Sequence, residues 1–219
     1  MFKPVKFEQP KKFEFNKENL TLAQQIIAKY PKGKQASAVM PLLDLAQRQH
    51  HNWIPLAAMD YVADMLEMPA IRVYEVASFY TMYNKQPVGE NLIQICRTTP
   101  CWLRGSDEIT KACKDRLGIG IGETTKDNKF TLVEVECLGA CVNAPMVQIN
   151  DDYFEDLNAE SMLTLIDKLT KGEKIKVGSQ TGRQCSSPLA FALSAPNVAK
   201  PKKAPAKKNA AKPKKPSGK

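Results

Sequence analysis

The sequence predicts an α+β protein in which a small N-terminal helical bundle precedes an α/β domain. Apolar residues recur every three to four positions from about residue 16 to residue 80, which is typical of amphipathic helices. Near Phe79 the apolar pattern changes to a period of two, which indicates strands. With 219 residues, 43% of them hydrophobic, the chain is long enough to fill the core of one large domain or two small ones.

The expected bundle consists of four short helices joined by tight Pro, Gly and Asn turns. Asn16 can cap the first helix, which reaches about residue 30. The second covers about 35–50, the third has Pro55 in its first turn, and the fourth starts at Pro69. The residues expected to face inward are Leu20, Ala23, Ile26, Ile27, Tyr30, Val39, Leu42, Leu43, Ala46, Leu56, Met59, Val62, Ala63, Leu66, Val73, Val76 and Ala77.

The second half of the chain predicts alternating strands and helices. The expected elements are a strand over 91–96, a helix over about 103–117, a strand over 130–135, a hairpin of 146–149 with 152–154, and a helix from Asn158 to Leu169. This order of strand, helix, strand, strand, strand and helix is that of a thioredoxin-like α/β sandwich.

We expect five regions along the chain. They are an extended N-terminal arm over 1–15, the helical bundle over 16–85, the thioredoxin-like domain over 86–172, an irregular segment over 173–199, and a disordered Lys/Ala/Pro tail over 200–219.

The net charge of +9 belongs to the tail. Nine of the 32 basic residues lie between Lys200 and Lys219, where there is no acidic residue, which leaves 23 basic against 23 acidic side chains in residues 1–199. A solubilising terminus is the simpler interpretation of this tail, and an electrostatic tether to acidic protein, RNA or anionic lipid is the alternative. Because the body of the chain is neutral, nucleic acid is not an expected partner.

The composition also predicts a reducing compartment and no membrane-spanning helix. No run of 18 or more apolar residues occurs, so we expect any membrane association to go through a partner. The N-terminus has neither an apolar signal region nor an Arg/Ser-rich presequence, which predicts a mature start in the cytosol. Thiols remain reduced there, and clustered cysteines are then more often metal ligands or redox groups than disulfides.

Two cysteine pairs carry the strongest functional signal. Cys96 and Cys101 have four intervening residues, Cys137 and Cys141 have three, and 35 residues separate the pairs. Four thiolates can bind zinc or an iron-sulfur cluster, so the ligand type alone does not decide between them. The wider first spacing is typical of plant-type 2Fe-2S ferredoxins, because two irons and two sulfides need more span than one zinc ion. The spacing therefore favours a binuclear cluster.

The residues around the pairs fit such a cluster. A 2Fe-2S unit with four thiolates carries a charge of about −2, so its sulfurs need hydrogen-bond donors. Thr98, Thr99 and the backbone amides around Gly139 can supply them, and Pro100 and Pro145 stiffen the two loops.

Other candidate residues have simpler interpretations. Cys113 lies on the apolar face of its predicted helix and is expected to be a buried structural thiol. Cys185 is expected to be a free thiol in a loop, and His50 and His51 to have a surface or capping role at a helix end. The glycines of 118–122 follow a helix and open none, so they predict a turn and not a nucleotide-binding loop.

Four segments also carry a resemblance to a known family. They are CRTTPCWLRGS (96–106), LGI (117–119), GETT (122–125) and EVECLGACVNAPMVQIND (134–151). These segments resemble the thioredoxin-like 2Fe-2S subunit of respiratory NADH:quinone oxidoreductase, or complex I, and the likeness covers roughly residues 15–188, including Gly182, Arg183 and Cys185. The Lys-rich tail departs from the common core of that family.

The resemblance implies a function for the whole chain. It implies a peripheral-arm subunit in which Cys96, Cys101, Cys137 and Cys141 ligate one 2Fe-2S cluster, which exchanges an electron with the FMN of a partner flavoprotein that also binds NADH. Other peripheral-arm iron-sulfur subunits are implied as neighbours, on the cytoplasmic side of the inner membrane or on the matrix side in mitochondria. The chain would then be part of a proton-translocating oxidoreductase, without activity in isolation.

Two alternatives stay open from the sequence. One is the equivalent diaphorase subunit of a NAD-linked hydrogenase or formate dehydrogenase. The other, from a different class, is a zinc-stabilised adaptor whose basic tail binds nucleic acid.

Overall fold

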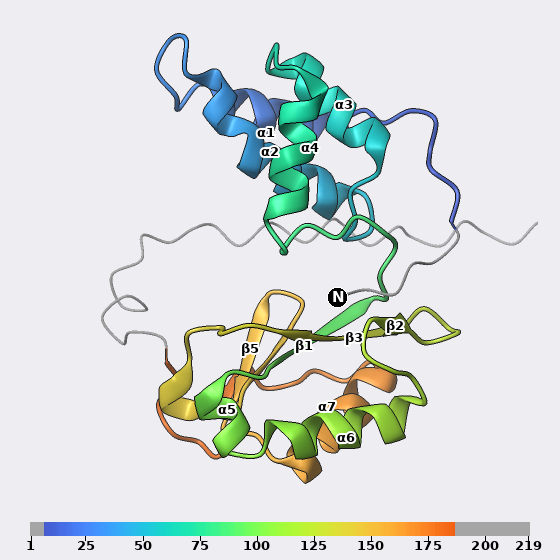
Figure 1. Ribbon diagram of the computed structural model, residues 1–219, viewed down its shortest axis with the longest axis vertical. Coiled ribbons are helices and arrows are strands. Elements are labelled where there is room, and N and C mark those ends of the chain that lie inside the picture. The colour runs from blue at the N-terminus through green and yellow to red at the C-terminus, as the bar shows by residue number, and fades with distance from the viewer. Residues whose placement is uncertain (1–6, 187–219) are drawn as a thin grey trace, which may run out of the picture. The chain divides into compact units, whose positions relative to one another are not determined.

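The computed structural model describes residues 7–186 of the chain. The expected disordered tail over 200–219, the start of the expected arm and the end of the expected irregular segment lie outside the described residues. Figure 1 shows the order of the elements, in which α1 to α4 come first and a mixed sheet with its helices follows.

The predicted four-helix bundle is confirmed, with small shifts in its boundaries. Its helices are α1 (Lys17–Ile27), α2 (Val39–Gln49), α3 (Leu56–Met65) and α4 (Ala70–Phe79), and the 3-10 helix η1 (Gln35–Ala38) precedes α2. The side-chain oxygen of Asn16 accepts a hydrogen bond of 2.8 Å from the amide of Asn19, as expected of a cap. The first helix ends at Ile27, short of the expected residue 30. Pro55 and Pro69 are the N-caps of α3 and α4, so each of these helices starts one residue later than expected.

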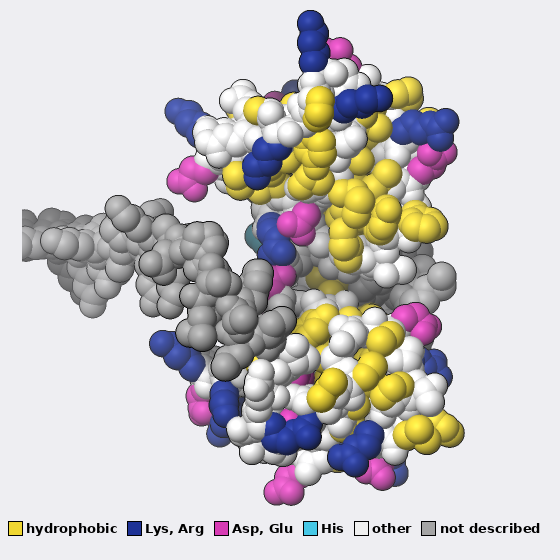
Figure 2. Space-filling model, turned by 90° about the vertical axis from the view of Figure 1, so that its left-hand side faces the viewer, with side chains coloured by type: hydrophobic (Ala, Val, Ile, Leu, Met, Phe, Trp, Pro, Cys, Tyr) yellow, Lys and Arg dark blue, Asp and Glu magenta, His cyan; other side chains and the backbone are white. Residues whose placement is uncertain are grey.

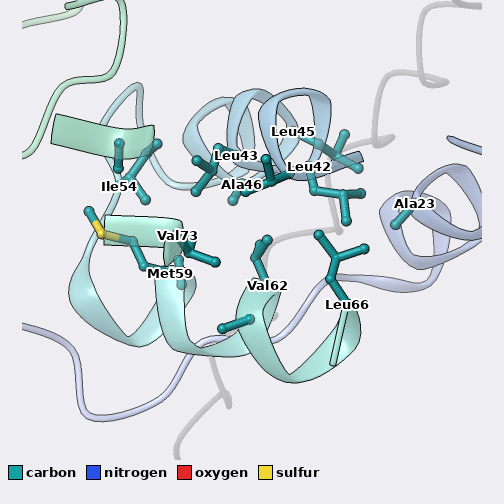
Figure 3. Close-up of a cluster of buried hydrophobic side chains, with 14 of the residues drawn as sticks. Ala23, Leu42, Leu43, Leu45, Ala46, Ile54, Met59, Val62, Leu66 and Val73 are labelled. Atoms are coloured by element: carbon teal, nitrogen blue, oxygen red, sulfur yellow. The ribbon is translucent and has the colours of Figure 1, made fainter. Parts of the chain in front are cut away.

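The bundle core lies between α2, α3 and α4. Figure 3 shows Leu42, Leu43 and Ala46 of α2 facing Val62 of α3 and Val73 of α4. Most of the residues expected to face inward are buried or packed against this core. Leu56 is the exception among them, because the first residue of α3 points to solvent and is 49% exposed.

The segment before α1 is part of the bundle core although it forms neither helix nor strand. Phe13 and Phe15 are buried and meet edge to face at 5.5 Å. Further upstream, Phe7 packs on Trp53 at 5.1 Å, and the side chain of Gln9 accepts a hydrogen bond from the amide of Leu56. The alternating phenylalanines of this segment therefore fill the space beside the helices.

The sheet has six strands in the order β2-β3-β1-β4-β5-β6. They are β1 (Asn91–Cys96), β2 (Glu123–Thr124), β3 (Phe130–Val135), β4 (Val147–Ile149), β5 (Asp152–Glu155) and β6 (Gly178–Ser179). β1 pairs with β3 in parallel and with β4 in antiparallel orientation. The strands expected over 91–96 and 130–135 are confirmed with those bounds, whereas β2 and β6 were not predicted.

Helices α6 (Ser106–Leu117) and α7 (Ala159–Thr170) lie side by side on one face of the sheet (Figure 1). The buried residues between them and the strands include Ile93, Ile109, Leu132, Phe154 and Ile166. α7 is capped by Asn158 as predicted, through a bond of 2.8 Å from the amide of Ser161.

The helix expected over about 103–117 is confirmed as α6, which starts three residues later, whereas the short helix before it was not predicted. The additional helix is α5 (Thr99–Leu103), which ends before Gly105, and α6 begins directly after this glycine. Gly105 has φ of +96°, a conformation that L side chains rarely adopt and that stops a continuous helix. Cys101 consequently lies inside a helix of its own.

No helix within residues 7–186 combines the length and the apolar character needed to cross a membrane.

Candidate metal centre

The sheet register brings the two cysteine pairs to one place. Cys96 is the last residue of β1 and lies opposite Val135, the last residue of β3. Because β1 and β3 are parallel, the chain leaves both strands at the same edge of the sheet. Cys137 follows β3 by two residues, and Cys101 follows β1 within α5. Two segments far apart in sequence therefore deliver their thiols side by side.

The first pair is buried. Cys96 is 2% and Cys101 is 1% exposed, and both pack with Ala140, Ala144 and Met146 in a small cluster of their own. The hydroxyl of Thr98 lies 3.4 Å from the sulfur of Cys96, as expected of a donor to this site. The pair thus lies in a mostly apolar environment with a polar group at the sulfur.

The second pair reaches the surface. Cys137 and Cys141 are exposed, their sulfurs lie 3.9 Å apart, and the amide of Gly139 donates to the sulfur of Cys137 at 3.4 Å. Two thiolates at about 2.3 Å from one tetrahedral metal ion lie about 3.8 Å from each other. The observed separation therefore suits two ligands of the same metal ion.

The environment makes the thiols chemically different. Burial raises the pKa of Cys101 to about 12. Burial acts in the same direction on Cys96, but hydrogen bonds from Thr98 and from the amide of Leu138 outweigh it and lower the pKa of Cys96 below its ordinary value. The neighbouring thiol of Cys137 raises the pKa of Cys141. Because metal ions bind thiolates, binding at Cys101 and Cys141 requires proton release.

In residues 7–186, no three or more His, Cys, Asp or Glu side chains are arranged to hold a single metal ion. The thiols instead form one buried and one exposed short-range pair. A binuclear cluster takes two terminal thiolates on each metal ion, so the residues present fit that group.

Comparison with known proteins identifies the family. The model of the family described as thioredoxin-like [2Fe-2S] ferredoxin matches residues 23–170. The chain belongs to this family. The thioredoxin-like fold expected from the order of elements is thereby confirmed.

The relatives of this ferredoxin-family chain include proteins named as NADH-quinone oxidoreductase and NADH dehydrogenase components. It is 65% identical over 157 residues to an NADH-quinone oxidoreductase subunit of Rickettsia bellii, covering 72% of this chain and 94% of the relative. It is 58% identical over 174 residues to "NADH dehydrogenase [ubiquinone] flavoprotein 2, mitochondrial" of Dictyostelium discoideum, covering 80% of this chain and 70% of the relative. The resemblance read from the four sequence segments is thus confirmed.

A solved structure shares the fold. A chain of the NAD+-reducing [NiFe]-hydrogenase in its H2-reduced state matches with a TM-score of 0.53 at 21% identity, over 61% of this chain and 23% of the hydrogenase chain. The chain therefore spans about a quarter of the length of that hydrogenase chain, and the likeness concerns the fold alone.

The remaining candidate residues lie where the sequence predicted. Cys113 is fully buried in α6, and burial raises the pKa of its thiol to about 12. Cys185 is half-buried in a loop and forms no disulfide. His50 ends α2 and packs on Trp53 at 4.6 Å, and residues 121–122 form a turn.

The sequence did not predict the polar residues that surround the loop after Cys141. Asn143, Glu155 and Arg183 come together there, and Glu155 is only 2% exposed. One signal for Glu155 was available, because this acidic residue directly follows the apolar Phe154 at the end of the predicted hairpin. The partners of Glu155 could not be found in the same way, because they are distant in sequence.

Proposed function

We propose that the chain is an electron-transfer subunit of NADH:quinone oxidoreductase that holds one 2Fe-2S cluster through Cys96, Cys101, Cys137 and Cys141. The observation that carries the proposal is the meeting of the two cysteine pairs at the ends of the parallel strands β1 and β3. The family match and the names of the relatives at 58% and 65% identity support it.

The cluster, when bound, supplies one-electron chemistry. The residues of this chain then have three tasks. The cysteines provide the four thiolates, and the hydroxyl of Thr98 and the amide of Gly139 stabilise negative charge on the sulfurs of Cys96 and Cys137. Burial of the first pair excludes water on one side of the site, whereas the exposed second pair leaves the other side open to a partner.

We further propose that the partner is a flavoprotein subunit that binds FMN and NADH, and that the cluster exchanges an electron with this flavin. Large apolar side chains directly follow the cysteines, since Trp102 is 56%, Leu103 is 70% and Val142 is 83% exposed. Apolar side chains reach the surface in several places on the face seen in Figure 2. Such exposed apolar groups suit a protein interface. The chain would then be a peripheral subunit on the cytoplasmic or matrix side, next to other iron-sulfur subunits.

The test of the cofactor is analysis of the full chain purified without oxygen. We expect two irons and two acid-labile sulfides per chain, and an EPR signal after reduction with dithionite. One zinc ion per chain without sulfide would contradict the proposal and support the zinc-stabilised adaptor instead.

The test of the complex is the set of proteins that co-purify from the native source. An FMN-binding flavoprotein together with quinone-arm subunits is the expected result. A hydrogenase or formate dehydrogenase subunit in their place would assign the chain to those NAD-linked enzymes. The relatives at 58% and 65% identity favour the first outcome.

A further inference from the structure

The loop that follows Cys141 is held by a segment close to the end of the described chain. The guanidinium of Arg183 donates to the carbonyl of Val142 at 3.0 Å and to the side-chain oxygen of Asn143. The side-chain amide of Asn143 donates in turn to the carbonyl of Gln184 at 2.8 Å. The residues directly after a proposed ligand are thus bonded to two residues about forty positions away.

A buried carboxylate joins the same two segments. Glu155, at the end of β5, is 2% exposed and accepts a bond of 2.7 Å from the side-chain amide of Asn143. It also accepts bonds from the amide of Ser186 at 3.0 Å and from its hydroxyl at 2.7 Å. A buried carboxylate is tolerated only where donors surround it, and here they come from the cysteine loop and from the C-terminal segment. Loss of either segment would leave Glu155 without part of its donors.

Asp156 orients Arg183. The carboxylate of Asp156 lies 2.9 Å from the guanidinium and also accepts from the hydroxyls of Ser179 at 2.6 Å and Thr181 at 3.3 Å. The Nη2 of Arg183 that pairs with Asp156 is also the nitrogen that donates to Val142 and Asn143, while the Nε donates to Asp156 at 3.3 Å. Asp156 therefore holds the side chain of Arg183 in the position from which it contacts the loop after Cys141.

The backbone of the segment folds back tightly on itself. Gly178 has φ of +85°, and a Cβ atom built on it would lie 3.3 Å from the Cβ of Cys185. A residue with a side chain at position 178 would therefore be strained and would crowd Cys185. In Figure 1 this segment is the orange-red end of the described chain, beside the yellow loop that carries Cys141.

We propose that residues 178–186 are a clamp that fixes the loop carrying Cys141, and that Arg183 is its main positioning residue. The clamp lies beyond the region that the family model matches, which ends at residue 170. The inference rests on the proposed function, because it assigns the clamp to the cluster ligand Cys141. The clamp fixes the Val142 carbonyl through its hydrogen bond to the guanidinium of Arg183. Because Val142 directly follows Cys141, this bond also fixes the orientation of the Cys141 side chain.

The clamp is tested with three variants of the full chain carrying its cluster. Arg183→Gln removes the guanidinium, and Arg183→Lys keeps the charge but loses the planar fork of donors. Arg116→Gln is the matched control, because Arg116 also pairs with an aspartate, Asp167, and is 53% exposed against 54% for Arg183, but it lies between α6 and α7.

For Arg183→Gln we expect cluster loss to a chelator to be about ten- to a hundredfold faster than in the unchanged chain. The g-values of the reduced cluster should also change, because the orientation of one ligand changes. Arg183→Lys should restore part of both properties, and Arg116→Gln should match the unchanged chain. Equal rates and spectra for Arg183→Gln and Arg116→Gln would overturn the clamp.

A fourth variant tests the position of the segment without removing a donor. Gly178→Ala should displace the backbone near Cys185 and accelerate cluster loss in the same direction as Arg183→Gln. An unchanged rate in Gly178→Ala, with Arg183→Gln still fast, would contradict a clamp formed by the whole segment.

The apoprotein separates failure of the clamp from failure of the proposed function. Amide hydrogen exchange of residues 141–146 should be faster in apo Arg183→Gln than in the unchanged apoprotein, and unaltered exchange would contradict the clamp. Absence of iron and sulfide from the unchanged chain would contradict the proposed function. It would not affect the test of the clamp by hydrogen exchange, because that test uses the apoprotein.

Discussion

The two cysteine pairs differ in their access to water as well as in their spacing in the sequence. Cys96 and Cys101 are nearly inaccessible, whereas Cys137 and Cys141 are exposed. A cluster bound by all four would have two ligands shielded by Met146 and its neighbours and two ligands at the surface. Since solvent exposure and hydrogen bonds to sulfur tune the reduction potential, the two metal ions of such a cluster would not be equivalent.

Serine substitutions separate the proposed ligands from the structural thiol. Cys96→Ser and Cys137→Ser should each lose the EPR signal of the reduced cluster, because each removes one thiolate. Cys113→Ser should keep the signal but lose about 1–3 kcal/mol of unfolding free energy, because a hydroxyl without a partner enters the core. Spin quantification and urea unfolding measure these effects. A full signal in both ligand variants would refute the assignment.

The sequence could single out the four cysteines as candidate ligands because the members of each pair are close in the chain. The hydroxyl of Thr98 was found for the same reason, since it lies two residues from Cys96. Arg183 and Glu155 could not be assigned to the site, because the contacts that place them join residues 12 to 41 positions apart and follow no period. Residue roles that depend on the path of the chain need the structure.

His50 should make the stability of the chain depend on pH near neutrality. Burial, assisted by the nearby His51, lowers the pKa of His50 below its ordinary value of 6.5. The unfolded chain therefore takes up this proton first as the pH falls, so stability is highest above 6.5 and decreases as the pH falls through the lower pKa of the folded state.

The measurement is the urea midpoint of unfolding at pH 7.5 and at pH 5.5. We expect a lower midpoint at pH 5.5, and a smaller difference between the two pH values in His50→Gln. His51→Gln is the control, and it should keep most of the difference. An identical pH response in the unchanged chain and in His50→Gln would show that other groups cause it.

At the scale of elements, the sequence predicted the long helices, the central strands and the hairpin of β4 and β5, but not the shortest elements. The strands over 91–96 and 130–135 have six residues each and a recognisable apolar pattern. β2 and β6 have two residues each, which is too short for a period to be seen. The helix α5 has only five residues and was missed for the same reason, and the start of α6 was expected slightly early because a single glycine inside a helical pattern is often tolerated.

Gly89 lies two residues before β1 and packs closely against the backbone of β3. A Cβ atom on Gly89 would lie 2.8 Å from the backbone of Phe130, which the pairing of β1 with β3 holds in place. Gly89→Ala should therefore cost about 1–3 kcal/mol of unfolding free energy, as expected of overpacking. Urea unfolding measures this cost. Glu90→Ala is the control beside it, because it shortens an exposed side chain, and an equal cost in the two variants would contradict the steric argument.

For the whole molecule, the buried apolar residues of the bundle and those of the α/β part of the chain form separate clusters. One buried cluster belongs to the bundle and the segment before it, and the others belong to the sheet, its helices and the cysteine pairs. This division was predictable because the period of the apolar pattern changes between them. The contribution of Phe13 and Phe15 to the bundle core was not, because a segment without a period gives no signal of burial.

The distribution of charge makes a prediction for the complete chain. Removal of residues 201–219 deletes eight of the nine lysines of the tail and reduces the net charge from +9 to +1. Because the cysteine pairs and both cores lie within residues 7–186, we expect the truncated chain to keep its iron content and its binding to the flavoprotein. Its elution from a cation exchanger should move to lower salt, since multivalent lysine contacts are lost. Iron analysis, co-purification and ion-exchange elution of the two chains measure these effects. Loss of assembly with unchanged iron content would instead show that the tail is a docking element for the complex.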